Sequence, residues 1–376
     1  MRVLITGGAG FIGSNLSLAL VRSGHEVTVL DSLSPQIHGN TPRASALFKS
    51  IEDRVAFVEG SVTDESAWLL ALKGQEAIVH LAAETGTGQS MYEIKRYVDV
   101  NIGGTALMLN LLGTCPGSVR KILVASSRAL YGEGKYQSSD GIVYPPARRQ
   151  EDLAAGRFDL YCERTNAALK LLPTDEESKI HPSSVYGITK QTQEQLVMTV
   201  CPALRIAATA LRYQNVYGPG QSLSNPYTGI LSIFSTLLLN GKSIDVFEDG
   251  LESRDFVFID DVIEATTLAL LKPEADGHIV GIGSGTRTTV MTAAETLRAK
   301  FEQDVDINVS GTYRLGDIRH NYADISKAKR LLGFVPAVDF DTGIAHFVQW
   351  VMRQPIPMSD YDKSIGELKS KGLIRG

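Results

Sequence analysis

Cysteine, tryptophan and long apolar runs are scarce in this sequence. Its 376 residues include three cysteines, Cys115, Cys162 and Cys201, and two tryptophans. Three scattered cysteines with no C-x-x-C pair argue against a disulfide framework and a zinc knuckle, and they fit a reducing compartment. The longest nearly apolar stretch, residues 229–239, is interrupted by serine and threonine and is shorter than the roughly 20 residues of a membrane-spanning helix.

The sequence also lacks a dominant charge. It has 37 Lys and Arg against 42 Asp and Glu, a net charge of −5, and 43% of its residues are hydrophobic. Neither a disordered chain nor a broad nucleic-acid-binding face has this composition. The first residues lack the apolar stretch and cleavage site of a signal peptide. We therefore expect a cytoplasmic globular protein that binds neither nucleic acid nor membrane.

The first half alternates short apolar runs with helix-period segments, a pattern typical of a parallel sheet flanked by helices. Strands are predicted at 3–6, 26–30, 55–58, 77–81, 121–125 and 206–211, and helices at 14–23, 65–72, 97–112 and 185–200. The spacing predicts an α/β fold with a doubly wound sheet, which binds ligands beyond the carboxyl ends of its strands.

Two segments depart from this alternation. Residues 133–182 contain Pro145-Pro146 and no clear period, so they are interpreted as an insertion near the site. After residue 211 the chain becomes rich in Gly, Pro and Asn and predicts a smaller second domain. Residues 256–259, 260–271 and 278–281 predict one more strand, helix and strand that return to the main sheet.

A glycine-rich turn joins the first predicted strand to a helix. In Thr6-Gly-Gly-Ala-Gly-Phe-Ile-Gly13, Gly7 permits a sharp turn, Gly10 permits backbone to approach a pyrophosphate, and Gly13 permits close packing of helix on strand. Such turns also occur for packing alone. Asp31 ends the second strand, where a carboxylate can accept hydrogen bonds from a ribose diol, although a strand-end turn former is the alternative. With no Arg adjacent, NAD is favoured over NADP.

Three further residues suggest alcohol–ketone chemistry. Tyr186 and Lys190 lie four residues apart at the start of a predicted helix, hence on one face, and Ser127 lies at the end of the fifth strand. Lys190 and an oxidised nicotinamide would lower the pKa of Tyr186, which could then act as general base. Tyr-x-x-x-Lys pairs are common on ordinary helices and strand-end serines are usually caps. The combination, in this order, is more specific.

The motifs together resemble those of the extended short-chain dehydrogenase/reductase family, within it the NAD-dependent nucleotide-sugar epimerases and dehydratases. The resemblance covers nearly the whole chain and rests on TGGAGFIGS, HLAAE, NIGGT, SSRALYGEG, YGITK, RYQNVYGPG, ESRDFVFIDDV and YRLGDIRHNYADISKAKRLLGF. It implies a Rossmann-type NAD-binding domain, residues 1–213, with the insertion 133–182 and with 251–282 returning to it. Residues 214–250 and 283–376 would form a smaller α/β nucleotide-sugar-binding domain.

The resemblance also implies roles for individual residues. The catalytic residues would be Ser127, Tyr186 and Lys190, with no metal. The cofactor would contact Gly7, Gly10, Phe11, Ile12, Gly13, Asp31, Ser32, Ser61, Val62, Leu81, Ala82, Ala83, Asn101, Tyr186 and Lys190. The substrate would contact Glu84, Ser127, Arg128, Asn215, Arg254, Arg314 and Asp317. For Arg254 and Arg314 a surface or interdomain salt bridge is the alternative.

Departures from the family pattern narrow the activity. Ser61 stands where many relatives have an Asp that contacts adenine, so this contact should be weaker. Dehydratases resemble Thr-Asp-Glu where this chain has Ser127-Arg128-Ala129, which leaves no obvious acid or base for dehydration. Residues 84–93 and 225–234, with the insertion, look most like the dTDP-L-rhamnose 4-epimerase-like and UDP-glucose 4-epimerase-like branch.

We therefore expect reversible inversion at carbon 4 of a nucleotide-linked hexose. A net NAD(P)-dependent oxidoreductase or a dehydratase on the same fold is the alternative, and a non-catalytic dinucleotide-binding protein is less favoured because Tyr186 and Lys190 are both present. The resemblance also implies a homodimer formed through the helices at 97–112 and 185–200. Apolar faces on these helices could equally belong to the core.

Overall fold

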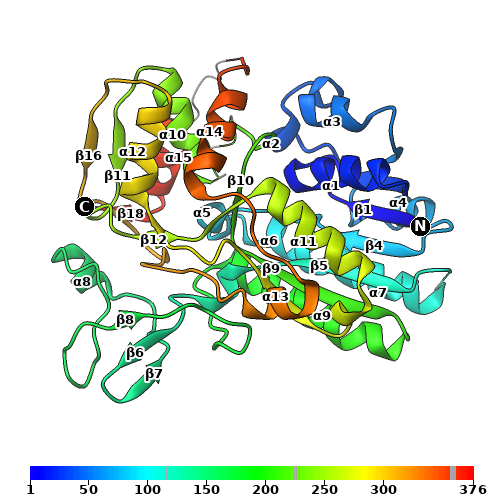
Figure 1. The fold of residues 1–376 in the computed structure, drawn as a ribbon, viewed down its shortest axis with the longest axis horizontal. Helices are drawn as coiled ribbons and strands as arrows, with labels where there is room; N and C mark the ends of the chain where they lie inside the picture. The colour runs from blue at the N-terminus through cyan, green and yellow to red at the C-terminus, as the bar shows by residue number, and fades with distance from the viewer. Residues whose placement is uncertain (116, 224, 226, 228, 356–360) are drawn as a thin grey trace.

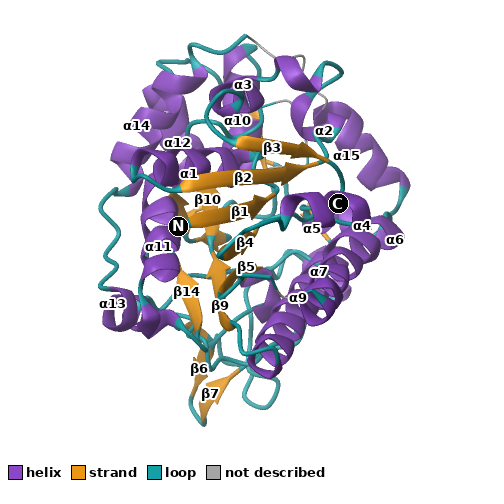
Figure 2. Ribbon diagram, turned by 90° about the vertical axis from the view of Figure 1, so that its right-hand side faces the viewer, coloured by secondary structure: helices purple, strands orange, loops and turns teal. Residues whose placement is uncertain are grey.

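The computed structural model describes residues 1–115, 117–223, 225, 227, 229–355 and 361–376, with only the backbone of 361–363. Pro226 and Thr228, in a segment that the sequence singled out, lie outside the described residues. A seven-stranded parallel sheet runs through the molecule in the order β14-β9-β5-β4-β1-β2-β3 (Figure 2). Its strands are β1 (Arg2–Thr6), β2 (Glu26–Asp31), β3 (Ala56–Glu59), β4 (Ala77–His80), β5 (Lys121–Ser127), β9 (Ala207–Tyr213) and β14 (Ile279–Ile282). The predicted α/β fold with a doubly wound sheet is confirmed.

Both faces of this sheet are buried under helices. Alternate residues of β1 face opposite sides, so Val3 and Ile5 pack in one apolar cluster and Leu4 in another. The first cluster receives α1 (Phe11–Arg22) and α11 (Ile259–Leu271), and the second receives α4 (Glu65–Ala71), α7 (Gly104–Thr114) and α9 (Val185–Ala203). The two groups of helices lie on opposite sides of the strands in Figure 2. Continuous burial explains why the strands are runs of apolar residues.

The element ends differ from the predictions by a few residues. Helix α1 begins at Phe11 rather than at 14, because Gly10 is already its N-cap. Strands β5 and β9 extend two residues further than predicted, to Ser127 and Tyr213, and Ser127 therefore ends its strand. The helix predicted at 97–112 is continuous but contains a π-helical segment, η2 (Val98–Gly103), between α6 (Ile94–Tyr97) and α7.

The insertion, residues 133–182, projects from the molecule at the lower left of Figure 1. It carries a three-stranded antiparallel sheet of order β7-β6-β8 and a short helix. These elements are β6 (Tyr136–Ser138), β7 (Gly141–Val143), α8 (Gln150–Ala154) and β8 (Lys170–Leu171). The insertion thus has secondary structure of its own, as the sequence suggested.

The rest of the chain forms short strand pairs with helices around them. Figure 1 places most of these elements at the upper left, on one side of the sheet. The strands are β10 (Asn215–Tyr217), β11 (Ile244–Val246), β12 (Ser253–Arg254), β13 (Phe256–Phe258), β15 (Thr288–Thr289), β16 (Ile307–Val309), β17 (Tyr313–Arg314) and β18 (Ile374–Arg375). The helices are α2 (Pro35–His38), α3 (Ala46–Ile51), α5 (Thr87–Ser90), α10 (Ile230–Leu239), α12 (Val290–Lys300), α13 (Ser326–Leu332), α14 (Phe340–Val351) and α15 (Tyr361–Ser370).

One sheet prediction was wrong. The strand predicted at 256–259 does not join the main sheet, because β13 pairs in parallel with β10 in a separate two-stranded sheet. Only β14 returns to the main sheet, beside β9. The first apolar cluster nevertheless extends from Val3 of β1 to Phe347 of α14, so the two predicted domains share one packed interior. Among the described residues, no helix has the length and apolar character needed to span a membrane.

Candidate active site

A single cavity of about 910 Å³ lies beyond the carboxyl ends of the main-sheet strands. Every residue that the sequence predicted for cofactor, substrate or catalysis lines it, with the exception of Asn101. The parallel topology explains this convergence, because strands β1, β2, β4, β5 and β9 all end at the same edge.

The glycine-rich turn is packed too tightly for side chains at two positions. Gly7 has a φ of +67°, and a Cβ there would lie 2.9 Å from the backbone of Ala82. A Cβ on Gly13 would lie 2.2 Å from the carbonyl oxygen of Gly7. The turn therefore brings the N-terminus of α1, with its unpaired N–H groups, to the cavity wall. That is the arrangement that binds phosphate.

Asp31 stands at the cavity wall at the end of β2 and is 9% exposed. Its carboxylate accepts hydrogen bonds from the backbone N–H of Ala9 at 3.0 Å and of Leu33 at 2.8 Å. Burial raises the pKa of Asp31, and these hydrogen bonds act in the opposite direction. The side-chain-free turn and this acceptor beside it fit the pyrophosphate and ribose of NAD.

Ser127 and Tyr186 meet at the centre of the cavity. The hydroxyl of Ser127 accepts a hydrogen bond from the N–H of Ala129 at 3.1 Å and lies close enough to the phenol of Tyr186 to act on its pKa. Tyr186 is placed at the start of α9, where its N–H donates to Ser90 Oγ at 3.0 Å and its ring meets that of Tyr97 edge-on. Burial raises the pKa of Tyr186, whereas Ser127 and the charge of Arg128 act to lower it.

Lys190 lies one helical turn beyond Tyr186 and is 3% exposed. Its ammonium donates to the carbonyl oxygen of Ala125 at 2.7 Å and to Gln193 Oε1 at 2.9 Å. Burial lowers the pKa of Lys190 to about 7. The charge of Arg128 also acts to lower the pKa of Tyr186. The expected effect of Lys190 together with an oxidised nicotinamide stays a prediction.

Asn101 does not line the cavity, so the structure does not support a direct contact with the cofactor. It does make hydrogen bonds that support the site, a role that the family resemblance also implies. It is fully buried in the π-helical segment η2, where its side-chain amide pairs with the backbone of Glu84: Oδ1 accepts at 2.7 Å and Nδ2 donates at 3.1 Å. Nδ2 also donates to Thr189 Oγ1 on α9 at 2.9 Å. Asn101 therefore supports the site from behind, by tying the loop after β4 to the helix that carries Tyr186.

Arginines dominate the other end of the cavity. Arg254 Nη2 donates to Asp317 Oδ1 at 2.8 Å, so the salt bridge considered as its alternative role is present, although both residues line the cavity. Arg128 Nε donates to Asn215 Oδ1 at 2.8 Å, and Arg314 lies over the ring of Phe247. Burial acts to raise the pKa of Asp317, but Arg254, Arg314 and other arginines hold it at about 2.

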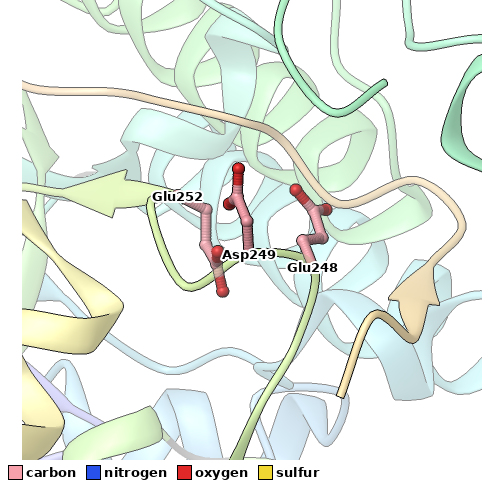
Figure 3. Close-up of side chains that lie close together, drawn as sticks. All are labelled: Glu248, Asp249 and Glu252. Atoms are coloured by element: carbon pink, nitrogen blue, oxygen red, sulfur yellow. The ribbon is translucent and has the colours of Figure 1, made fainter. Parts of the chain in front are cut away.

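Three acidic side chains, Glu248, Asp249 and Glu252, lie close together behind this end (Figure 3). Arg319 binds Asp249 through two hydrogen bonds of 2.7 Å and reaches Glu248 at 3.1 Å. Arg148, from the insertion, pairs with Glu248 at 2.8 Å. These ion pairs hold Glu248 and Asp249, whereas Glu252 Oε2 is buried without a hydrogen-bond partner and burial raises the pKa of Glu252 to about 7. The prediction of no metal stays a prediction.

Several residues of the site were missed by sequence reasoning. Arg148 and Arg319 were not singled out, because their acidic partners are distant in sequence. Tyr227 and Phe247 line the cavity from loops, and Ile365 and Leu368 line it from α15 near the end of the chain. No local pattern marks these positions, since only the folded chain brings them to the cavity.

Comparisons with known proteins agree with the fold. The chain is 40% identical over 94% of its length to dTDP-L-rhamnose 4-epimerase of Burkholderia thailandensis, of which it covers 95%. It is 30% identical to UDP-glucose 4-epimerase of Mycolicibacterium smegmatis over 93% of this chain and 98% of that protein.

Two solved structures are similar over 94% of this chain and 99% of theirs. UDP-glucose 4-epimerase of Thermotoga maritima, with UDP-glucose, has a TM-score of 0.75 and 29% identity. UDP-glucuronic acid 4-epimerase of Bacillus cereus, with UDP-glucuronic acid and NAD, has a TM-score of 0.77 and 25% identity. Residues 3–154 and 164–283 match the family described as NAD dependent epimerase/dehydratase. The resemblance seen in the sequence is confirmed, and the chain belongs to the NAD dependent epimerase/dehydratase family.

Proposed function

We propose that this protein is an isomerase, an NAD-dependent nucleotide-sugar epimerase that inverts carbon 4 of a dTDP- or UDP-linked hexose through a transient 4-keto sugar. The observation that carries the proposal is that Ser127 and Tyr186, the glycine-rich turn and three arginines all line one cavity. In this cavity a sugar hydroxyl can reach Ser127 and Tyr186 while the cofactor binds at the glycine-rich turn and the nucleotide of the substrate contacts the arginines. The names of the similar proteins support the same reaction.

Tyr186 removes the proton of the 4-hydroxyl, and Ser127 donates a hydrogen bond to the same oxygen. The Ser127 Oγ already accepts the N–H of Ala129, so its own proton is available for this purpose. When bound, NAD would supply the hydride acceptor for carbon 4, and after the 4-keto sugar turns in the cavity the hydride would return to the opposite face of the ketone. Tyr186 then gives its proton back to the new 4-hydroxyl, and no cofactor is consumed. Lys190 on α9 donates hydrogen bonds to the carbonyl oxygen of Ala125 on β5 and to Gln193 on its own helix. It therefore holds α9 against β5 beside Ser127 and Tyr186.

The charges at the other end suit a diphosphate. Arg128, Arg254 and Arg314 line the cavity together with the carboxyl groups of Asp245, Glu252 and Asp317. The three arginines carry the proposal, because guanidinium groups make short charge-assisted hydrogen bonds to phosphate oxygens. We assign the nucleotide of the substrate to this end and its hexose to the Ser127–Tyr186 end.

Dehydration is disfavoured by what surrounds Ser127. Arg128 and Ala129 follow it, so that segment supplies no carboxyl group. The neighbouring carboxylate, Glu84, is bound to Arg96 at 2.7 Å and is not free to act as a base. A net oxidoreductase would use the same residues and differs only in whether reduced cofactor leaves the site.

The test uses the purified protein without added cofactor. We would mix it in turn with dTDP-L-rhamnose, dTDP-glucose, UDP-glucose, UDP-N-acetylglucosamine and GDP-mannose, and record proton NMR spectra and absorbance at 340 nm. The expected result is a new anomeric signal with an inverted carbon-4 coupling and no accumulating NADH. Sustained NADH formation on adding NAD would instead identify an oxidoreductase. Tyr186→Phe should retain NAD yet lose about 10²–10⁴-fold in kcat, the usual contribution of a general base.

We further propose that the protein is cytoplasmic and acts as a homodimer. Ile94, Val98 and Ile188 are large apolar residues that are 51%, 38% and 49% exposed. They lie on α6, η2 and α9, which pack against one another and coincide with the helices named from the sequence. A second copy placed on this face would cover them. The domain boundaries given above remain part of the proposal.

A further inference from the structure

The last residues of the chain return to the cavity. Strand β18 pairs antiparallel with β17, the strand that carries Arg314, and the N–H of Leu315 donates to the carbonyl oxygen of Leu373 at 2.9 Å. Among the described strands, β18 is the only one that β17 pairs with. The backbone that presents Arg314 to the cavity is therefore held by the C-terminal segment.

Helix α15 supplies part of the cavity wall. Ser364, Ile365 and Leu368 line the cavity, and Leu368 is 4% exposed. Leu368 lies against the loop after β4, because a Cβ on Gly88 would be 3.5 Å from its side chain. The apolar side chains of Ile365 and Leu368 thus form part of the cavity wall next to the loop after β4.

A chain of polar contacts fastens this helix. Tyr92 OH donates to Tyr227 OH at 2.9 Å, and Tyr227 OH donates to Glu367 Oε2 at 2.5 Å. Burial is the largest cause that raises the pKa of Tyr227, so its hydroxyl keeps its proton for this contact. The ammonium of Lys371 lies 5.9 Å from the centre of the Tyr92 ring. Helix α15 is thereby joined to the segment after β4 and to the loop of Tyr227, both of which contribute residues to the cavity wall.

The same loop positions the catalytic tyrosine. Ser90, four residues after Gly86, accepts a hydrogen bond from the N–H of Tyr186, and the backbone of Thr85 accepts one from Tyr97. The C-terminal segment therefore contacts the supports of Tyr186 through α15 and the strand of Arg314 through β18. It spans the hexose end and the nucleotide end of the site.

We propose that residues 361–376 complete the substrate site and determine its affinity for the nucleotide sugar, with Ile365 and Leu368 as the wall beside the hexose. This inference rests on the proposed function. It assigns substrate contacts to a segment that is distant in sequence from the glycine-rich turn, the triad and the arginine motifs. The segment acts on binding and not on proton transfer, because none of its described side chains contacts Ser127 or Tyr186 in the structure.

The test compares Ile365→Trp, which fills the cavity from α15, with Lys369→Ala, which changes an exposed residue of the same helix. We expect Ile365→Trp to raise both the KM and the dissociation constant for dTDP-L-rhamnose or UDP-glucose by about 10-fold or more, with kcat within about twofold and NAD retained. Lys369→Ala should match the wild type. A Trp variant with unchanged KM and affinity would overturn the inference, as would one that lost kcat alone.

A second measurement does not depend on a substitution that folds well. Backbone hydrogen exchange of residues 364–376 in the intact protein should slow when saturating dTDP-L-rhamnose or UDP-glucose binds, and unchanged exchange there would contradict the inference. The two proposals are separable. If the wild-type protein binds these nucleotide sugars without converting them, the proposed reaction is contradicted, and the dissociation constants of the wild type and Ile365→Trp still test the role of α15. If the wild type converts them and Ile365→Trp has an unchanged KM and dissociation constant, only the role of α15 is contradicted.

Discussion

At the scale of single residues, the cavity contains one cation, Arg128, that acts directly on the pKa of Tyr186. Arg128 makes its hydrogen bond through Nε to Asn215, and within the described chain it forms no ion pair. Burial is the main cause that lowers the pKa of Arg128, to about 10, and the neighbouring charge of Arg254 adds to this effect. An arginine tolerates this environment because its ordinary pKa is so high that it remains charged near neutral pH.

The charge of Arg128 should be visible in the pH profile. It stabilises the phenolate of Tyr186, so Arg128→Met removes a positive charge and raises the pKa of Tyr186 further. The acidic limb of the kcat profile, which requires the deprotonated phenol, should move to higher pH. Arg128→Lys keeps the charge and should leave the limb in place while KM changes. An unshifted limb in Arg128→Met would show that another group controls Tyr186.

Gly13 permits a direct test of the cofactor turn. The added Cβ of Gly13→Ala would lie 2.2 Å from the Gly7 carbonyl and 2.6 Å from the Cα of Gly8, so backbone must move. We expect the variant to purify with little or no NAD, measured by absorbance after denaturation. Gly113→Ala, in helix α7 with its nearest neighbour at 3.8 Å, should retain NAD and is the matched control. Full NAD content in Gly13→Ala would contradict the assignment.

At the scale of elements, the insertion is fastened to the nucleotide end by buried charge. Arg148 has a side chain that is 3% exposed and pairs with Glu133 at 3.2 Å and Glu248 at 2.8 Å. Its Nη2 also donates to the carbonyl oxygen of Asp317 at 3.0 Å. The side chain of Asp317 in turn holds Arg254. The insertion therefore reaches the predicted substrate residues through the main chain of Asp317.

Removing Arg148 should leave the buried Glu133 without its ion pair and Glu248 with Arg319 alone. We expect Arg148→Met to lower the free energy of unfolding by about 3–5 kcal/mol, the usual cost of breaking a buried ion pair. Chemical denaturation measures this directly. Arg149→Met, next to it but with a side chain that is 75% exposed, should change stability by less than about 1 kcal/mol. Equal effects of the two variants would mean that the network contributes nothing beyond an ordinary surface pair.

At the scale of the whole molecule, one packed interior unites parts of the chain that the sequence divided into two domains. The first apolar cluster includes residues from β1, α1, α10, α12 and α14. A cavity built between such parts keeps its two ends at a fixed separation, which a reaction on a nucleotide-linked sugar requires. In the proposed homodimer, a second copy would cover the exposed apolar residues of α6, η2 and α9.

The dimer proposal predicts a change in mass. Ile188→Asp places a charge at the centre of the exposed apolar face and should convert a dimer to a monomer in light scattering after gel filtration. Val309→Asp, on β16 and 54% exposed, is the control and should stay dimeric. A wild-type protein that runs as a monomer, or an Ile188→Asp variant that stays a dimer, would contradict the proposal.

The sequence was informative wherever a function depends on local spacing. Gly7, Gly10 and Gly13 lie within one turn, and Tyr186 and Lys190 lie within one helical turn, so their proximity needs no knowledge of the fold. Ser127 and Asp31 were placed correctly at the cavity because the carboxyl ends of parallel strands meet at one edge of the sheet.

Other features depended on contacts between distant segments. The sequence motif suggested that Asn101 contacts the cofactor, but the direction of its side chain is set by packing in the π-helical segment, and it turns to Glu84. The pairing of β13 with β10 could not be predicted either, because an apolar strand can form its backbone hydrogen bonds with any accessible strand edge.

The parallel sheet, the glycine-rich turn and the Tyr186–Lys190 pair could be predicted from the sequence, because each follows from periodicity or from spacing within one element. Ser127 was added to the pair by its place at a strand end and by the family resemblance. That Arg148 reaches Asp317, and that Ile365 and Leu368 line the cavity, became known only from the folded chain. These contacts join residues far apart in the chain. Their energies come from burial and charge pairing in the folded state, which leave no local pattern in the sequence.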